Sequence, residues 1–312
     1  MSEVNETQAS PELIEQVRNE MSQSGLSQND AAKQIDIKNT TISQWLRGIY
    51  PGDNDKVNEK VACWLSACAE RRGSIASMPA PPAWVETPTA KKISATFSYA
   101  QMAGVMGIVY GGAGVGKTVT SKHYAKSYPN VWHVELMADA GGKLECAREI
   151  CEVMGLTATG NASQLRRDIV SHAKGSLGLL IIDEAQFLKP LSLEMMRGIW
   201  RQAGIGVVLV GNEVVYAQLT GGQRAASFAQ LFSRISKKQR LNKPLKGDVF
   251  KLADAWNVQG KKERDLLWNI ANKNGALRSL TEVLRLASMY AADEVLSGKF
   301  INAAWQELGG MQ

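Results

Sequence analysis

A glycine-rich segment in the middle of the chain has the residue types and spacing of a phosphate-binding loop. It follows a short apolar run and precedes a segment that can form a helix. Glycines let consecutive backbone N–H groups turn toward a phosphate, and a helix N-terminus adds positive potential. The lysine would reach the β- and γ-phosphates of ATP, and the threonine hydroxyl would ligate Mg²⁺. The predicted nucleotide-binding residues are Gly111, Gly112, Ala113, Gly114, Val115, Gly116, Lys117 and Thr118.

Two acidic residues follow an apolar run further along the chain. Residues 179–182 are Leu-Leu-Ile-Ile, which is typical of a buried strand, and Asp183 and Glu184 come directly after them. Parallel strand ends place such carboxylates beside the phosphate loop. We expect Asp183 to hold Mg²⁺ and Glu184 to orient the attacking water. The second acid indicates a hydrolase rather than a protein that only binds nucleotide.

Three polar residues after these motifs occur in the order found in AAA+ ATPases. Asn212 follows the apolar run 206–210, Arg234 lies in Phe-Ser-Arg-Ile, and Arg278 lies in Gly-Ala-Leu-Arg. They resemble a γ-phosphate sensor, an arginine finger that reaches a neighbouring subunit's ATP, and the second sensor at the nucleotide. Each arginine alone could equally form a surface salt bridge. Arg224 is the alternative to Arg234 as the finger.

Strand-like and helix-like segments predict the domain organisation. A chain of 312 residues exceeds one typical domain. Strand patterns at 106–110, 131–136, 177–182 and 206–210 alternate with helical patterns, which indicates a parallel sheet with helices on both faces. The predicted fold is therefore an α/β phosphate-loop AAA+ ATPase core between an all-α domain and a small helical bundle. The expected bounds are 1–70 for the first domain, 71–90 for a proline-rich linker, 91–243 for the core and 244–312 for the bundle.

The first domain contains two short helical segments with the pattern of a helix-turn-helix. A short turn at Asp36 separates the two segments, and inward-facing apolar residues pack them together. The stretch resembles repressor/Cro-type DNA-binding domains. Asp36 stands where a turn glycine is common, but aspartate tolerates the left-handed conformation that the turn needs. The resemblance implies a second helix that presents four residues to double-stranded DNA: Asn39, Thr40, Thr41 and Gln44.

Charge is distributed unevenly along the chain. Residues 1–70 contain 6 Lys+Arg and 11 Asp+Glu, whereas residues 231–264 contain 10 Lys+Arg and 3 Asp+Glu. The basic stretch predicts a polyanionic partner, most simply DNA, bound by the ATPase part of the chain. The acidic balance of the first domain indicates that its DNA contacts are weak or depend on many copies. The basic residues expected to contact DNA are Arg166, Arg167, Lys237, Lys238 and Arg240.

No secretory signal pattern and no membrane-spanning apolar run are visible in the sequence. The four cysteines occur as two Cys-x₄-Cys pairs inside helical patterns, and the three histidines are scattered. Zinc sites usually have closer cysteine pairs with histidine partners, so we expect reduced thiols in a cytoplasmic protein.

The layout as a whole resembles the Mu transposition protein B family. The segments that carry this resemblance are Ile181–Ala185, Leu209–Asn212, Leu231–Ile235, Asp254–Trp256 and Gly275–Arg278. It implies an ATP-dependent ATPase that binds DNA with little sequence preference and forms a homo-oligomeric helical filament on it. It also implies that the protein delivers target DNA to a transposase and stimulates strand transfer.

Two other functions are compatible with parts of the sequence. The helix-turn-helix would also suit a transcription regulator that uses ATP as a switch, which predicts sequence-specific, stoichiometric binding. A small-molecule kinase could use the phosphate loop, but the sequence offers it no acceptor site and no use for Asn212, Arg234 and Arg278.

Overall fold

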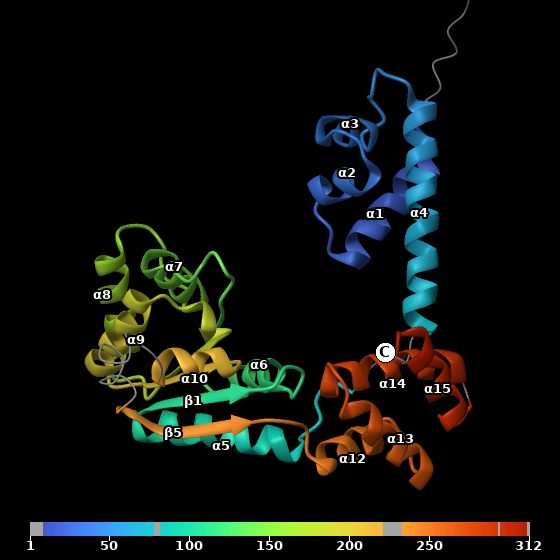
Figure 1. Ribbon diagram of the computed structural model, residues 1–312. Coiled ribbons are helices and arrows are strands. Elements are labelled where there is room, and N and C mark those ends of the chain that lie inside the picture. Colours follow the sequence, from blue (N-terminus) through green and yellow to red (C-terminus); the bar gives the residue numbers. More distant parts are fainter. Residues whose placement is uncertain (1–8, 78–81, 221–232, 293, 311–312) are drawn as a thin grey trace, which may run out of the picture. The chain divides into compact units, whose positions relative to one another are not determined.

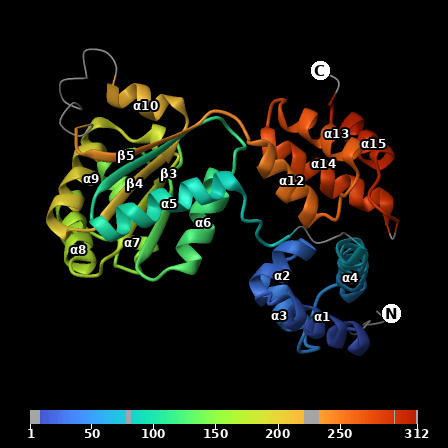
Figure 2. The same ribbon diagram turned by 90° about the horizontal axis from the view of Figure 1, so that it is seen from below.

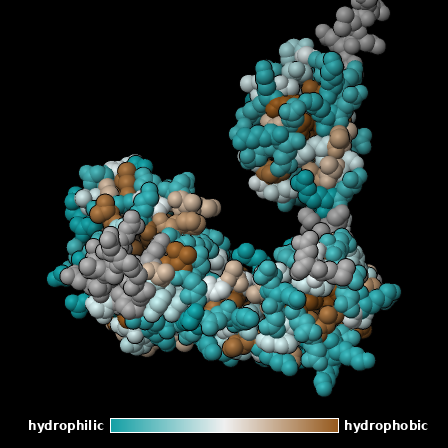
Figure 3. Space-filling view, in the orientation of Figure 1, coloured by the Kyte–Doolittle hydropathy of each residue, from teal (hydrophilic) through white to brown (hydrophobic). Residues whose placement is uncertain are grey.

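The computed structural model describes residues 9–77, 82–220, 233–292 and 294–310. The chain divides into two compact units, Met1–Pro79 and Ala80–Gln312. Among the described residues, no helix is long and apolar enough to cross a membrane. On the face seen in Figure 3, both units have a mostly hydrophilic surface with small separate apolar areas.

The first unit is a helical domain. It consists of α1 (Pro11–Ser24), α2 (Gln28–Ile35), α3 (Asn39–Trp45) and α4 (Asn54–Ser77). Ser10 and Ser27 cap α1 and α2 with their side chains, and Asp36 ends α2 in the left-handed conformation (φ 58°) expected of the turn. The fully buried Ile42 and Trp45 of α3 pack into the core between the helices. The α2–turn–α3 arrangement agrees with the predicted helix-turn-helix.

Helices reach into both ends of the expected linker, 71–90. Helix α4 continues to Ser77, past the expected domain end at residue 70. An ion pair of 2.6 Å between Arg72 and the buried Glu20 ties this part of α4 to α1. At the other end, α5 (Pro88–Ala103) begins inside the expected linker, because Thr87 caps it and proline is favourable at the first helical position.

The second unit contains a five-stranded sheet in which every strand pair is parallel. Its order is β2-β3-β4-β1-β5. The strands are β1 (Met106–Gly111), β2 (Val131–Glu135), β3 (Leu179–Asp183), β4 (Gly206–Gly211) and β5 (Ile235–Leu241). The helices of this part are α6 (Lys117–Ser127), α7 (Lys143–Val153), α8 (Ala162–Ala173), α9 (Pro190–Ala203), α10 (Glu213–Thr220) and the short 3-10 helix η1 (Ala185–Phe187).

Helices cover both faces of the sheet (Figures 1 and 2). Helices α5 and α6 contact one face, and α7, α9 and α10 contact the other, with α8 packed on α7 and α9. Because strand side chains alternate between faces, Ile181 and Val208 join the core under α5 and α6, whereas Ile182 and Leu209 join the opposite one. The alternation of strands and helices thus produces the predicted three-layer core.

Strand β5 was not predicted, since its sequence has no apolar run. It lies at the edge of the sheet beside β1, and the side chains between its buried ends are half-buried or exposed. Lys237 donates to the carbonyl of Ala95 in α5 (3.1 Å), whereas Arg240 pairs with Glu213 of α10 (3.2 Å). The basic residues of this strand therefore do not share one face.

The C-terminal helices form a bundle with its own core. They are α12 (Lys246–Ala255), α13 (Lys261–Ala271), α14 (Ala276–Ala291) and α15 (Gly298–Glu307). The fully buried Asp248 joins α12 to α5, since its carboxylate accepts from the backbone N–H (2.7 Å) and hydroxyl (2.6 Å) of Thr89. It also accepts from the N–H of Leu245 (2.7 Å). These bonds satisfy the buried charge and fix the bundle to the start of the α/β core.

Candidate active site

The phosphate loop connects the end of β1 to the start of α6. Gly114 (φ 71°) and Gly116 (φ 92°) adopt left-handed conformations that strongly favour glycine. The buried Val115 anchors the loop in the core beneath α5 and α6. Lys117 and Thr118 then begin α6, so the lysine and threonine lie at a helix N-terminus, as the motif predicts.

The backbone of two other elements lies in close contact with the loop. The N–H of Gly112 donates to the carbonyl of Leu241 at the end of β5 (2.8 Å), and the N–H of Leu277 donates to the carbonyl of Gly114 (3.0 Å). A Cβ atom on Gly114 would lie 1.9 Å from the carbonyl oxygen of Gly275. The loop is therefore held between the edge strand and the start of α14.

The Lys117 ammonium lies over the loop. It donates to the carbonyl oxygens of Gly111 (3.0 Å) and Gly112 (2.6 Å). Burial lowers the pKa of Lys117, and the nearby carboxylates of Asp183 and Glu184 partly offset that effect. A bound triphosphate would supply the negative charge that such a half-buried cation lacks.

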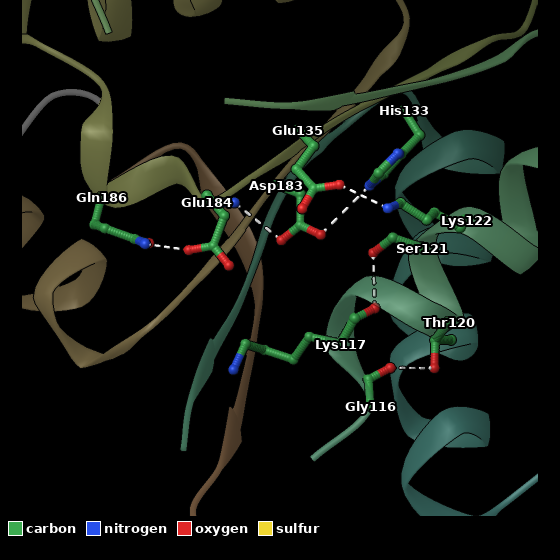
Figure 4. Close-up of polar contacts among 10 residues, drawn as sticks. All are labelled: Gly116, Lys117, Thr120, Ser121, Lys122, His133, Glu135, Asp183, Glu184 and Gln186. Atoms are coloured by element: carbon green, nitrogen blue, oxygen red, sulfur yellow. Dashed lines mark hydrogen bonds and ion pairs between the residues drawn. The ribbon is translucent and has the colours of Figure 1, made fainter. Parts of the chain in front are cut away.

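Asp183 is fully buried at the end of β3 and remains a good anionic ligand. Burial alone would raise its pKa, but hydrogen bonds from His133 and Thr118 and from the backbone N–H of Glu184 outweigh burial and lower the pKa. His133 Nε2 lies 3.4 Å from its Oδ2, and the Glu184 N–H lies 2.9 Å from its Oδ1 (Figure 4). A carboxylate beside a threonine hydroxyl offers the hard oxygen donors that Mg²⁺ requires, so these residues fit the predicted ion.

Glu184 is held by a residue that the sequence analysis did not identify. It adopts a left-handed conformation (φ 54°), and its carboxylate accepts a hydrogen bond from the side-chain amide of Gln186. The amide oxygen of Gln186 in turn accepts from the backbone N–H of Asn212 (3.4 Å). The side-chain oxygen of Asn212 caps α10 through the N–H of Val214 (2.9 Å). The ends of β3 and β4 are thereby connected.

A cleft of about 480 Å³ brings most of the predicted nucleotide residues together. The predicted residues that line it are Ala113, Gly114, Gly116, Lys117, Thr118, Glu184, Asn212 and Arg278. Its apolar wall comes from the segment before α5 and from the C-terminal bundle, including Val85, Leu252 and Trp256. Trp84 also lines it and stacks on His123 of α6 with a ring separation of 3.9 Å. Polar groups for phosphates thus lie next to an apolar surface suited to a base.

Comparison with known proteins identifies the family. The ATP-dependent target DNA activator B of Escherichia phage Mu is 39% identical to this chain over 271 residues, which cover 86% of each protein. This chain belongs to the Mu B transposition protein family. The family model for the C-terminal part of the Mu B transposition protein matches residues 233–308, an AAA domain model matches 101–219, and a helix-turn-helix model matches 14–53.

Other Mu B relatives support this assignment. The protein of the same name from Escherichia phage D108 is 38% identical over 86% of both chains. The Mu-like prophage FluMu DNA transposition protein B of Haemophilus influenzae is 34% identical over 86% of this chain and 94% of its own length. The ORC2 protein of Aeropyrum pernix, solved with ADPNP and ADP, has a similar fold: the TM-score is 0.54 at 17% identity over 70% of this chain and 66% of that one.

Arg234 does not line the cleft of its own chain. It directly precedes β5, whose first residue Ile235 pairs with Met106 and whose last residue Leu241 pairs with Gly111. At about 3.3 Å per strand residue, Arg234 lies roughly 20 Å from the phosphate loop. It lies at the amino ends of the strands, whereas the loop lies at their carboxyl ends. The alternative finger, Arg224, lies outside the described residues.

The predicted DNA-binding residues lie on three separate elements. On α3, Asn39, Thr40 and Gln44 are exposed and Thr41 is half-buried. On α8, Arg167 is exposed, and Arg166 donates to Gln202 of α9 (2.6 Å). Lys237, Lys238 and Arg240 lie on β5, where strand alternation places Lys238 and Arg240 on one face and Lys237 on the other. A single DNA strand would not meet all three residues of β5 in the same way.

The contact between Gly114 and Gly275 yields a testable prediction. Gly114→Ala should impair nucleotide binding, because its Cβ would displace α14 from the loop in addition to straining a φ of 71°. Gly155→Ala is the matched control, since Gly155 has a φ of 70° and nothing within 4 Å of the added Cβ. The control should lose about 1–2 kcal/mol of stability and keep its affinity for nucleotide. Titration with a fluorescent ATP analogue and thermal melts would compare them, and equal affinities for both variants would contradict this role of the contact.

Proposed function

We propose that this chain is an ATP-dependent, largely nonspecific DNA-binding ATPase that oligomerises on DNA, delivers target DNA to a transposase and stimulates strand transfer. The observation that carries the proposal is the single cleft that gathers Lys117, Thr118, Glu184, Asn212 and Arg278 in a member of the Mu B family. The relatives' name, ATP-dependent target DNA activator B, supports both the nucleotide and the target-DNA role. We place this activity in the cytoplasm of a bacterial or phage-infected cell.

Each residue of the cleft would have a distinct task in hydrolysis. Lys117 and the loop N–H groups would bind the phosphates, and Thr118 and Asp183 would hold Mg²⁺. An ion held there would supply positive charge to the phosphates. Glu184 would orient the attacking water, and Asn212 would contact the γ-phosphate. Arg278, which lies in α14 of the C-terminal bundle, would place its own positive charge at the nucleotide.

The position of Arg234 supports action between subunits. Its own phosphate loop lies at the carboxyl ends of the strands, whereas Arg234 lies at their amino ends. An arginine at the amino ends of the strands could reach the cleft of a neighbouring subunit if the subunits are arranged head to tail. Head-to-tail contacts generate rings or open helices, which agrees with a homo-oligomeric filament on DNA.

A first experiment tests the phosphate loop and the general base. Lys117→Ala should lose ATP binding, because it removes the half-buried cation above the loop. Glu184→Gln should keep binding but lose turnover by roughly 10²–10⁴-fold, since the amide is a poor proton acceptor. Equilibrium binding of an ATP analogue and release of phosphate would be measured for both variants. Wild-type affinity in Lys117→Ala would refute the assignment of this loop.

A second experiment tests Arg234 in trans. Arg234→Ala should slow DNA-stimulated hydrolysis by a factor on the order of 10³. Mixing it with Lys117→Ala should restore part of the rate, because an intact loop can then meet an intact arginine from a neighbour. The control mixture contains Arg234→Ala and the double variant Lys117→Ala/Arg234→Ala, which has no such arginine and should stay inactive. If mixing the variants restores no activity, and the wild-type rate of hydrolysis does not change with protein concentration, the chain would act as a monomeric switch instead.

A third experiment locates the nonspecific DNA contacts. A chain starting at Ala80 should retain ATP-dependent binding to random-sequence DNA. In the full chain, Lys238→Gln/Arg240→Gln should flatten the plot of log K against log salt by up to about 1.8, since each phosphate contact contributes about 0.9. Lys56→Gln/Lys60→Gln, which removes two lysines paired with aspartates in the first unit, is the charge-matched control.

The outcomes of that third experiment separate the two DNA-binding functions. Loss of all binding in the shortened chain, with a normal slope in the β5 variant, would place the contacts on the helix-turn-helix. Stoichiometric binding to one sequence would favour an ATP-switched transcription regulator.

A further inference from the structure

Gln186 connects two parts of the candidate active site through one side-chain amide. Its nitrogen donates to the carboxylate of Glu184, and its oxygen accepts from the backbone N–H of Asn212 (3.4 Å). Figure 4 shows the side chains of Gln186 and Glu184 pointing toward each other. The amide therefore bridges the end of β3, where the water-orienting carboxylate lies, and the end of β4, where the γ-phosphate sensor lies.

The two partners fix the orientation of this amide. An ionised carboxylate can only accept a hydrogen bond, and a backbone N–H can only donate one. Gln186 must therefore point its NH₂ group toward Glu184 and its oxygen toward Asn212, and a flipped amide would lose both bonds. Only a glutamine or a protonated acid of the same length supplies one donor and one acceptor in these positions.

The backbone around Gln186 fits closely to this bridging side chain. A Cβ atom on Gly211 would lie 2.5 Å from the amide oxygen of Gln186, so the glycine that ends β4 makes space for it. Glu184 is a non-glycine residue in a left-handed conformation, and such a conformation persists where neighbouring contacts hold it. The turn of η1, closed by the N–H of Phe187 on the carbonyl of Glu184 (3.1 Å), brings Gln186 back over Glu184.

We propose that Gln186 is a positioning residue that sets the direction of the Glu184 carboxylate and links it to the backbone of Asn212. The inference rests on the proposed ATPase function. By occupying one carboxylate oxygen, Gln186 restricts rotation of the carboxyl group and leaves the other oxygen to receive the proton of the attacking water. Because the same amide holds the N–H of Asn212, a displacement of the sensor by the γ-phosphate changes the direction of Glu184. Hydrolysis is thereby coupled to correct seating of the terminal phosphate.

Two variants of the full chain separate positioning from folding. Gln186→Ala removes both bonds and should lower kcat by roughly ten- to a hundredfold, with the KM for ATP changed less than about twofold. Gln186→Glu has the same shape and keeps the acceptor for Asn212, but at neutral pH it places a second carboxylate against Glu184. Like charges at this distance raise the pKa of the pair, so one proton is taken up as the pH falls. The shared proton then replaces the amide donor, and hydrolysis by Gln186→Glu should recover toward acid pH relative to that of wild type.

Lys117 and Asp183 also act on Glu184, but they are identical in wild type and variant. A difference between the two pH profiles therefore belongs to residue 186. The matched control is Gln164→Glu, the same substitution at the exposed start of α8, which should keep the wild-type kcat and pH profile. Thermal melts of all variants would verify folding.

The result that supports the proposal is a selective loss of kcat in Gln186→Ala together with acid recovery in Gln186→Glu. Wild-type kcat and pH profile in both variants would overturn it, and so would a loss expressed as weaker ATP binding at unchanged kcat. Failure of the proposed function would look different. In that case the wild-type chain itself would not hydrolyse ATP, or Glu184→Gln would hydrolyse it as fast as wild type.

Discussion

The candidate active site depends on the close approach of three backbone segments at the phosphate loop. Gly112 bonds to the end of β5, and Gly114 lies against the start of α14. A Cβ atom on Gly112 would lie 2.6 Å from the carbonyl oxygen of Asn242, and one on Gly114 would lie 1.9 Å from that of Gly275. Both contacts therefore require glycine on geometric grounds, and Gly114 also requires it for its φ of 71°. The edge strand and the C-terminal bundle are therefore parts of the nucleotide site. A nucleotide that reshapes the loop must act on both.

The same geometry explains how charges can be buried here. Lys117 loses hydration, which lowers its pKa, while Asp183 keeps its charge because three donors outweigh its burial. The site thus keeps a buried anionic oxygen for a divalent ion near the cleft in which Lys117 offers a cation for phosphate. Interactions in such a cleft are stronger than at the surface, so small displacements of Glu184 or Asn212 would have large effects on the proposed hydrolysis.

Much of the fold could be predicted because its strands are apolar. The runs that end at Asp183 and Gly211 are buried on both faces, which produces a continuous hydrophobic signal. Strand β5 gave no such signal, because an edge strand with lysines on both faces resembles an exposed loop. Helix α5 was not predicted, although Ile93, Phe97 and Ala100 recur at helical spacing, and the neighbouring prolines placed only its first three residues in the expected linker. The spacing alone would have identified it.

The candidate site was predictable only where motifs carry it. Lysine, threonine and the two acids stand at fixed distances from glycines or strand ends. The structure places Lys117, Thr118 and Glu184 around one cleft, with the buried Asp183 directly before Glu184 at the end of β3. Gln186 belongs to no such pattern. A glutamine three residues after a strand is not a motif in itself, and only the register of β3 with β4 brings it to Asn212. A contact made across strand ends cannot be obtained from a single stretch of sequence.

Net charge describes the first unit poorly, and its distribution matters more. The excess of acid over residues 1–70 hides the fact that residues 37–52 contain Lys38 and Arg47 and no acidic residue. This segment includes α3, whose exposed Asn39, Thr40 and Gln44 are uncharged. Such a surface can approach DNA but neutralises few phosphates, so one copy gains little electrostatic affinity. Head-to-tail assembly through Arg234 would place many such surfaces along one DNA molecule, where weak contacts add through effective concentration. In such an assembly, the DNA contacts of this surface would depend on the number of copies assembled, and hence on ATP.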